Sequence, residues 1–185
     1  MILALDPSLS STGYAVLDYD YNLIDCGKIT TKKGKIPKGD RIADLEDEDN
    51  RIYTIVNGIE KQVLSKVEID AIAAEAQFGG NNMKTAMQLS RVRGAFIYLF
   101  KSKGLKQNYQ EPSLVRKNLM GKGNASKEEV AEFIREFYKD NAMVEALGEF
   151  NDRPNKNKNS DIYDAIGIGI AYLNSLKDGK DNGNI

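Results

Sequence analysis

Residues 2–30, ILALDPSLSSTGYAVLDYDYNLIDCGKIT, contain three apolar runs separated by polar turns. The first run, Ile2 to Asp6, has the composition of a strand that is buried on both faces. The runs Gly13 to Asp18 and Leu23 to Thr30 predict two more strands, joined by the short polar turn Tyr19 to Asn22. Because short connections usually join antiparallel neighbours, we predict an antiparallel meander.

The rest of the chain predicts helices alternating with strands. The predicted elements are a helix over 42–63, a strand over 69–75, a helix over 83–103, a strand over 105–109, and helices over 112–119, 126–138 and 160–176. Asn57-Gly58 is a candidate kink in the first helix, and Ser126 with Glu129 forms a capping box. This order resembles the ribonuclease H layout, an α/β fold with a mixed five-stranded sheet flanked by helices. We expect a single domain over 1–176 and a flexible tail over 177–185.

Four carboxylates occupy positions that such a sheet would bring together. Asp6 ends the first strand, Glu75 ends the fourth, and Asp161 and Asp164 lie at the start of the last helix. In the ribonuclease H layout the first and fourth strands are neighbours, and helix residues three apart share a face. A DxxD pair alone is most often helix capping. Burying the whole set is costly unless it binds a cation, so the sequence predicts a metal site.

The composition narrows the chemistry of this site. The chain of 185 residues has no histidine and a single cysteine, which excludes Ser-His-Asp and Cys-His catalysis and zinc sites built on His or Cys. Carboxylate oxygens remain, and they favour Mg²⁺ or Mn²⁺. We interpret Cys26 as a small core residue rather than a reactive thiol. No stretch approaches the roughly 20 apolar residues that span a bilayer, so we expect a cytoplasmic protein that does not contact a membrane.

The charges are segregated along the chain although the formal net charge is only -1. Residues 76–127 are strongly basic and contain a single acid, Glu111, while acidic stretches flank this block at 44–49 and 128–136. A one-sided basic face fits a polyanion, and a solvated helix surface is the alternative. The candidate contacts to a polyanion in this block, such as DNA if the chain binds nucleic acid, are Lys84, Arg91, Arg93, Lys117 and Lys122.

Five segments, in order along nearly the whole chain, resemble the successive motifs of the RuvC family of Holliday junction resolvases, a family of bacteria and bacteriophages. They are residues 2–8, 12–14, 75–78, 91–95 and 161–165. The resemblance implies a metal-dependent endonuclease that resolves four-way DNA junctions by paired symmetric nicks. It also implies that Asp6, Glu75, Asp161 and Asp164 are catalytic ligands of two Mg²⁺ ions, for which Mn²⁺ can substitute.

The same resemblance implies roles for three further residues. Phe78 matches an aromatic residue that contacts bases near the crossover, although a core-capping role is the alternative. Lys127 ends a glycine loop that matches the family's loop with a functional lysine, and it can neutralise phosphate charge in the transition state. Arg116 aligns with a basic residue that the family commonly has at its active site. If the alignment is shifted by one position, Lys117 takes that place instead.

The predicted helix over 83–103 is apolar on more than one face and carries the small pair Gly94-Ala95. We therefore expect a twofold-symmetric homodimer built partly on this helix, because a four-way junction presents two equivalent strands to cut. A fully buried helix in a monomer would have a similar composition.

Two other functions compete with the nuclease. Residues 6–14 also resemble the first phosphate loop of actin-like and sugar-kinase-like ATPases, but those proteins enclose the nucleotide between two such domains, and this chain has the length of one and shows no Walker A pattern. The second alternative is a non-catalytic junction-binding protein, which would not need the four acids.

Overall fold

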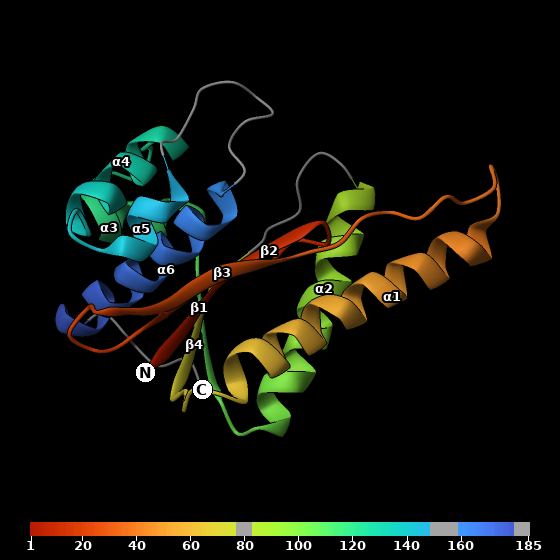
Figure 1. The fold of residues 1–185 in the computed structure, drawn as a ribbon, viewed down its shortest axis with the longest axis horizontal. Helices are drawn as coiled ribbons and strands as arrows, with labels where there is room; N and C mark the ends of the chain where they lie inside the picture. The colour runs from red at the N-terminus through yellow and green to blue at the C-terminus, as the bar shows by residue number, and fades with distance from the viewer. Residues whose placement is uncertain (77–82, 149–158, 180–185) are drawn as a thin grey trace.

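A computed structural model of the chain describes residues 1–76, 83–148 and 159–179, and its centre is a five-stranded sheet in the order β3-β2-β1-β4-β5 (Figure 1). The strands are β1 (Ile2–Asp6), β2 (Ser11–Leu17), β3 (Leu23–Thr30), β4 (Ala71–Glu75) and β5 (Lys106–Gln110). Strand β1 pairs antiparallel with β2 and parallel with β4, and β4 pairs parallel with β5. The mixed five-stranded sheet and the meander of its first three strands confirm the sequence prediction.

Helices cover both faces of this sheet (Figure 1). One face is covered by α1 (Arg41–Ile59), which continues into the π-helical turn η1 (Glu60–Leu64), and by α2 (Met83–Ser102). The other face is covered by α3 (Pro112–Met120), α4 (Lys127–Phe137), α5 (Ala142–Leu147) and α6 (Ser160–Lys177).

The alternation of side chains along β1 divides the core into two layers. Ile2 and Ala4 belong to the layer beneath α6, whereas Leu3 and Leu5 belong to the layer beneath α1 and α2. All four are at most 1% exposed, as expected for a central strand covered on both faces. The end of this strand is therefore held firmly from both sides, and that end carries Asp6.

Two local features differ from the sequence prediction. Asn57-Gly58 does not interrupt α1, which runs on to Ile59, and a Cβ on Gly58 would lie 3.0 Å from the side chain of Ile29, so the glycine lets the helix pack closely on β3. Helix α5 was not predicted, although its signals are present in the sequence. Asn141 caps its first turn by accepting hydrogen bonds from the backbone of Met143 and Val144, and Gly148 ends it at a positive φ of 76°.

Cys26 is half-buried and packs against the layer beneath α6. Burial, with a smaller effect from the charge of Asp25, raises the pKa of its thiol to about 11. The thiol is therefore protonated at neutral pH, which supports its interpretation as a packing residue. Among the described helices, none has the length and apolar character needed to cross a membrane.

Candidate active site

The ends of β1 and β4 bring Asp6 and Glu75 to the same edge of the sheet. The two strands are parallel neighbours with Leu5 opposite Ala74, so the residues that follow in each strand emerge side by side. Asp6, Glu75 and Asp164 of α6 line one cleft of about 70 Å³, together with Arg116 and Lys127. The apolar wall of this cleft is formed by Val115, Leu119, Val130 and Ile168.

Helix α6 brings the remaining acid, Asp161, to the same region. Asp161 lies in the first turn of the helix, next to its N-cap Asn159, and its charge raises the pKa values of both Asp6 and Asp164. The structure therefore gathers the four predicted acids from three separate elements. The helix amino terminus favours the negative charge of Asp161 there.

Burial and mutual repulsion raise the pKa values of three acids that line this cleft, Asp6, Glu75 and Asp164. Burial is the largest cause that raises the pKa of Asp6 well above its ordinary value, and the negative charge of Asp164 is the next. The pKa of Glu75 is raised by burial and then by Asp164. For Asp164, burial raises the pKa more than Lys127 lowers it. Partly desolvated carboxylates that repel one another gain most from a bound cation.

Lys127 makes the direct ionic contact in this cleft. Its Nζ lies 2.5 Å from Oδ2 of Asp164. Burial lowers the pKa of Lys127, but the attraction of Asp164, Asp6 and Asp161 outweighs burial, so the pKa is raised and the side chain is charged. Lys127 is the first residue of α4, and Ser126 and Glu129 form the predicted capping box that fixes this end of the helix.

Arg116 rather than its neighbour Lys117 lines the cleft. The charge of Arg116 lowers the pKa values of Glu75 and Asp164, which places the guanidinium near both acids. Lys117 is exposed, and successive helix residues point about 100° apart. The position of Arg116 supports the alignment in which Arg116, and not Lys117, matches the basic residue of the family's active site.

The donor set of the cleft fits a divalent metal in its chemistry. All its candidate ligands are carboxylate oxygens, the type preferred by Mg²⁺ and Mn²⁺. Within 1–76, 83–148 and 159–179, no three acidic, histidine or cysteine side chains lie in an arrangement that could hold a metal ion. Asp164 instead contacts Lys127, so a cation entering the cleft would compete with the lysine for this carboxylate.

Only part of the predicted basic face is free of acidic partners. Lys84 pairs with Asp44 of α1, and Arg91 pairs with both Glu48 and Asp49. The acids that flank the basic block in the sequence thus lie against it in the fold. The packing of α1 on α2 brings the two charge blocks together, so part of the predicted basic face is paired with acids.

The other predicted DNA contacts have varied surroundings. Lys122 forms an ion pair with Glu129. The guanidinium of Arg93 lies over the ring of Tyr109, 4.4 Å from its centroid. Lys117 is exposed on α3. Phe78 lies outside the described residues.

Helix α2 has an exposed apolar stripe as well as a buried one. Val92, Phe96, Leu99 and Phe100 are its buried residues. Met83, Met87 and Tyr98 are 78%, 62% and 78% exposed. Gly94 is also exposed, but Ala95 is half-buried and packs on the core, so the predicted small pair does not face solvent as a unit.

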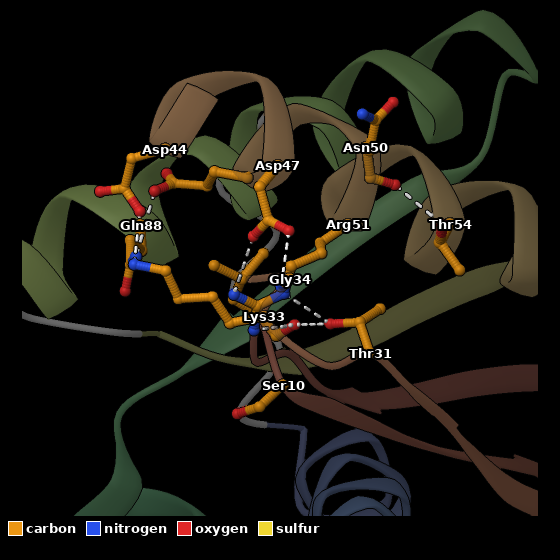
Figure 2. A network of polar contacts seen from close by, with 12 residues as sticks. Ser10, Thr31, Lys33, Gly34, Asp44, Asp47, Asn50, Arg51, Thr54 and Gln88 are labelled. Atoms are coloured by element: carbon orange, nitrogen blue, oxygen red, sulfur yellow. Dashed lines mark hydrogen bonds and ion pairs between the residues drawn. The ribbon is translucent and has the colours of Figure 1, made fainter. Parts of the chain in front are cut away.

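Arg51 was not predicted from the sequence, and it holds the loop that follows Asp6 (Figure 2). Its Nε donates a hydrogen bond to Oγ1 of Thr31 at 3.0 Å, and its terminal nitrogen donates to the carbonyl of Leu9 at 3.3 Å. Thr31 contacts the same carbonyl through its hydroxyl. The only sequence signal for Arg51 was a charged residue beside the apolar positions of a helix, which is common on helix surfaces.

The family model described as crossover junction endodeoxyribonuclease RuvC matches residues 2–172. The chain belongs to the RuvC family. A curated relative, the crossover junction endodeoxyribonuclease RuvC of Finegoldia magna, is 30% identical over 95% of this chain and 99% of its own length. This RuvC-family chain is accordingly an endodeoxyribonuclease of the Holliday junction resolvase type, which sets aside the ATPase and the non-catalytic binding protein.

Solved structures share the fold. Thermus thermophilus RuvC in complex with Holliday junction substrate superposes with a TM-score of 0.66 at 20% identity, covering 97% of this chain and 96% of that one. The yeast mitochondrial Holliday junction resolvase gives a TM-score of 0.64 at 10% identity, covering 97% and 81%. The ribonuclease H-like fold predicted from the sequence is confirmed by these matches.

Proposed function

We propose that this RuvC-family enzyme resolves four-way DNA junctions by a pair of symmetric nicks, through hydrolysis that depends on two Mg²⁺ ions. One observation carries the proposal. Asp6, Glu75 and Asp164, from three separate elements, line one cleft together with two cations of the chain. A cleft with this composition offers both metal ligands and positive charge to a phosphodiester.

The proposed ligands are Asp6, Glu75, Asp161 and Asp164. When bound there, Mg²⁺ supplies an activated water and stabilises the leaving oxygen of the phosphodiester, and Mn²⁺ can take its place. The four carboxylates hold and orient these ions. A bound cation is favourable there because it relieves the repulsion between the carboxylates. No histidine base is needed, which agrees with a chain that contains none.

Lys127 and Arg116 are proposed to bind the scissile phosphate. Both side chains line the cleft, Lys127 from α4 and Arg116 from α3. Lys127 is held by Asp164, which fixes its ammonium in the cleft. Its charge then stabilises the negative charge that builds on the phosphate oxygens in the transition state.

The proposed active form is a homodimer with twofold symmetry. The exposed stripe of Met83, Met87 and Tyr98 on α2 supplies apolar surface that a second copy would cover. Isologous pairing places one active site on each of the two equivalent strands of a junction. The substrate class is branched DNA, with Phe78 proposed to contact unpaired bases, and the expected compartment is the cytoplasm, where bacterial DNA lies.

A cleavage assay tests the proposal. A synthetic four-way junction incubated with the protein and Mg²⁺ should be resolved into nicked duplexes, while a linear duplex of the same sequence stays intact. Equal cutting of both substrates would show a nuclease without junction selectivity. Absence of cutting in Mg²⁺ and in Mn²⁺ would contradict the proposal altogether.

A further inference from the structure

The loop between β3 and α1 is strongly basic and has no role in the function described so far. Over residues 31–41 the sequence is TKKGKIPKGDR, which contains one acid, Asp40. Its basic residues are Lys32, Lys33, Lys35, Lys38 and Arg41. Asp40 is occupied as the N-cap of α1, where its side chain accepts from the backbone of Ala43. The loop thus carries a high density of positive charge outside the 76–127 block.

The loop leaves the sheet at the edge that carries the active site. Strand β2 starts at that edge, since its Gly13 pairs with Asp6 and its Ser11 pairs with Thr30, the last residue of β3. The chain therefore enters the loop one strand beyond the strand that pairs with β1. From there it runs beside the amino-terminal half of α1 and projects past the sheet (Figure 1).

The start of the loop is fixed by contacts with its surroundings. The backbone N–H of Thr31 donates to the carbonyl of Ser10 at 2.9 Å, and the N–H of Gly34 donates to Oδ1 of Asp47 at 2.8 Å (Figure 2). Lys33 forms an ion pair with Asp44. Arg51 bridges Thr31 to the loop after Asp6. The basic loop and the loop of the catalytic aspartate are thereby parts of one connected network.

The remaining cations of the loop are available to a ligand. Lys32, Lys35, Lys38 and Arg41 are all exposed. In the portion of the chain that the structure describes, these four have no acidic group within salt-bridge distance. On α2, by contrast, Arg91 is already held by Glu48 and Asp49. The loop therefore carries four exposed cations without an acidic partner among the described residues, whereas Lys84 and Arg91 of α2 both contact acids of α1.

We propose that residues 32–41, which comprise the loop and the first residue of α1 and are named here the basic loop, bind the phosphates of a DNA arm that leaves the active site. This inference rests on the proposed function and adds to it a second contact with the substrate. The ligand is a DNA backbone because the loop offers several exposed cations along a segment without helix or strand structure, and such a row of charge matches the regular spacing of phosphates. The fixed start of the loop reduces the ordering cost of that contact.

A charge-neutral variant, Lys32→Gln with Lys35→Gln and Lys38→Gln, tests the basic loop. Binding to a synthetic four-way junction is measured in EDTA, which prevents cleavage, over a range of salt concentrations. Each lost phosphate contact should lower the slope of log affinity against log salt by about 0.9, so three contacts lower it by about 2.7. Affinity near physiological salt should fall by about 10-fold or more.

The matched control changes three lysines at the opposite edge of the sheet, Lys61→Gln with Lys66→Gln and Lys106→Gln. These residues are exposed, and Lys106 pairs with the first residue of β4 rather than its catalytic end. The control alters net charge equally and should change the slope far less. Circular dichroism establishes that both variants keep the fold. If the slope of log affinity against log salt were equal for the two triple variants, the proposal would be overturned. The loop lysines would then be ordinary solvent-exposed side chains that do not contact DNA.

Lysine acetylation footprinting supplies a second readout that needs no variant. Bound junction should protect Lys32, Lys35 and Lys38 from reagent by several-fold and leave Lys61 and Lys66 unchanged. Full reactivity of the loop lysines in the complex would overturn the proposal even where the enzyme cleaves junctions normally. A wild-type protein that binds the junction but never cleaves it would contradict the proposed function alone, and one that does not bind would contradict both.

Discussion

Gly13 of β2 lies directly against the main chain of Asp161, the acid in the first turn of α6. A Cβ placed on Gly13 would fall 1.9 Å from the carbonyl oxygen of Asp161 and 2.4 Å from its carbonyl carbon. Only a residue without a side chain lets the helix end sit this close to the sheet. This contact therefore sets how deeply α6 carries its two acids toward Asp6.

We predict that Gly13→Ala displaces the start of α6 and impairs both stability and metal binding. The clash involves backbone rather than a flexible side chain, so overpacking should cost about 1–3 kcal/mol of unfolding free energy. Chemical denaturation measures that loss, and titration with Mn²⁺ measures the weakened metal affinity. The control is Gly94→Ala in α2, where a Cβ meets no described atom within 4 Å, and it should be neutral or slightly stabilising.

Each of Asp6→Asn, Glu75→Gln, Asp161→Asn and Asp164→Asn should abolish cleavage while junction binding survives. An amide removes the charge that holds the metal but does not change the exposed cations that contact DNA. Junction cleavage in Mg²⁺ and gel-shift affinity in EDTA measure the two properties separately. Any variant that keeps near wild-type turnover would remove its acid from the site.

The raised pKa of Asp6 predicts a stability change with a defined sign. Because its pKa is higher in the folded protein than in the unfolded chain, the folded state favours the protonated acid. The metal-free protein therefore loses stability from this group as pH rises from its unfolded pKa, near 3.8, through the raised folded pKa. Asp6→Asn should accordingly raise the melting temperature of the metal-free protein at neutral pH, and this gain should vanish near pH 3.8.

Added Mg²⁺ should make the wild type more stable than the Asp6→Asn variant, the reverse of the order expected without metal. Added Mg²⁺ binds the folded wild type and raises its melting temperature, whereas the Asp6→Asn variant should respond weakly. A variant that is less stable than wild type at neutral pH without metal would show that Asp6 does not bear the desolvation described above.

Met87→Glu should shift the protein from dimer to monomer. Met87 is exposed in the centre of the apolar stripe of α2, so a charge there opposes a second copy without entering the core. Sedimentation velocity measures the change. Leu114→Glu is the control, because Leu114 is also exposed but lies on α3, and its dimer should persist. A wild type that stays monomeric at working concentration would argue against the dimer.

Asp49→Asn should tighten junction binding modestly. Asp49 is exposed and shares Arg91 with Glu48, so its loss frees part of the arginine's charge for DNA. Exposed ion pairs contribute at most about 1 kcal/mol, which limits the gain to about fivefold. Asp20→Asn, on the turn between β2 and β3, removes the same charge from the far end of the sheet and should have little effect.

The elements that form the candidate site were predictable because their sequence signals are local. The apolar run Ile2 to Asp6 is buried on both faces, and its bounds agree with the prediction. The capping box of Ser126 and Glu129 was also confirmed in full. To predict that Asp6 lies beside Glu75, the order of the strands in the sheet was also needed. That order was inferred from the resemblance to the ribonuclease H fold, because the residues alone do not specify it.

The missed features depend on contacts between distant segments. Arg91 and Glu48 form an ion pair although they are 43 positions apart in the sequence, and no periodic pattern of residues predicts such a contact. The burial of Ala95 follows from which face of α2 meets the sheet, which a helix apolar on several sides does not specify. Helix α5 is six residues long, too short for a periodic pattern, so only its capping residues marked it.

The most direct measurement maps both nicks on a synthetic four-way junction whose strands are labelled separately. Junction is incubated with the protein in Mg²⁺, and the cut positions are read at nucleotide resolution, with Asp6→Asn as the inactive control. We expect cuts at symmetry-related positions on two opposing strands, leaving two intact duplexes, and none from the variant. Cuts on a single strand, at unrelated positions, or of equal extent with Asp6→Asn would contradict paired resolution by this site.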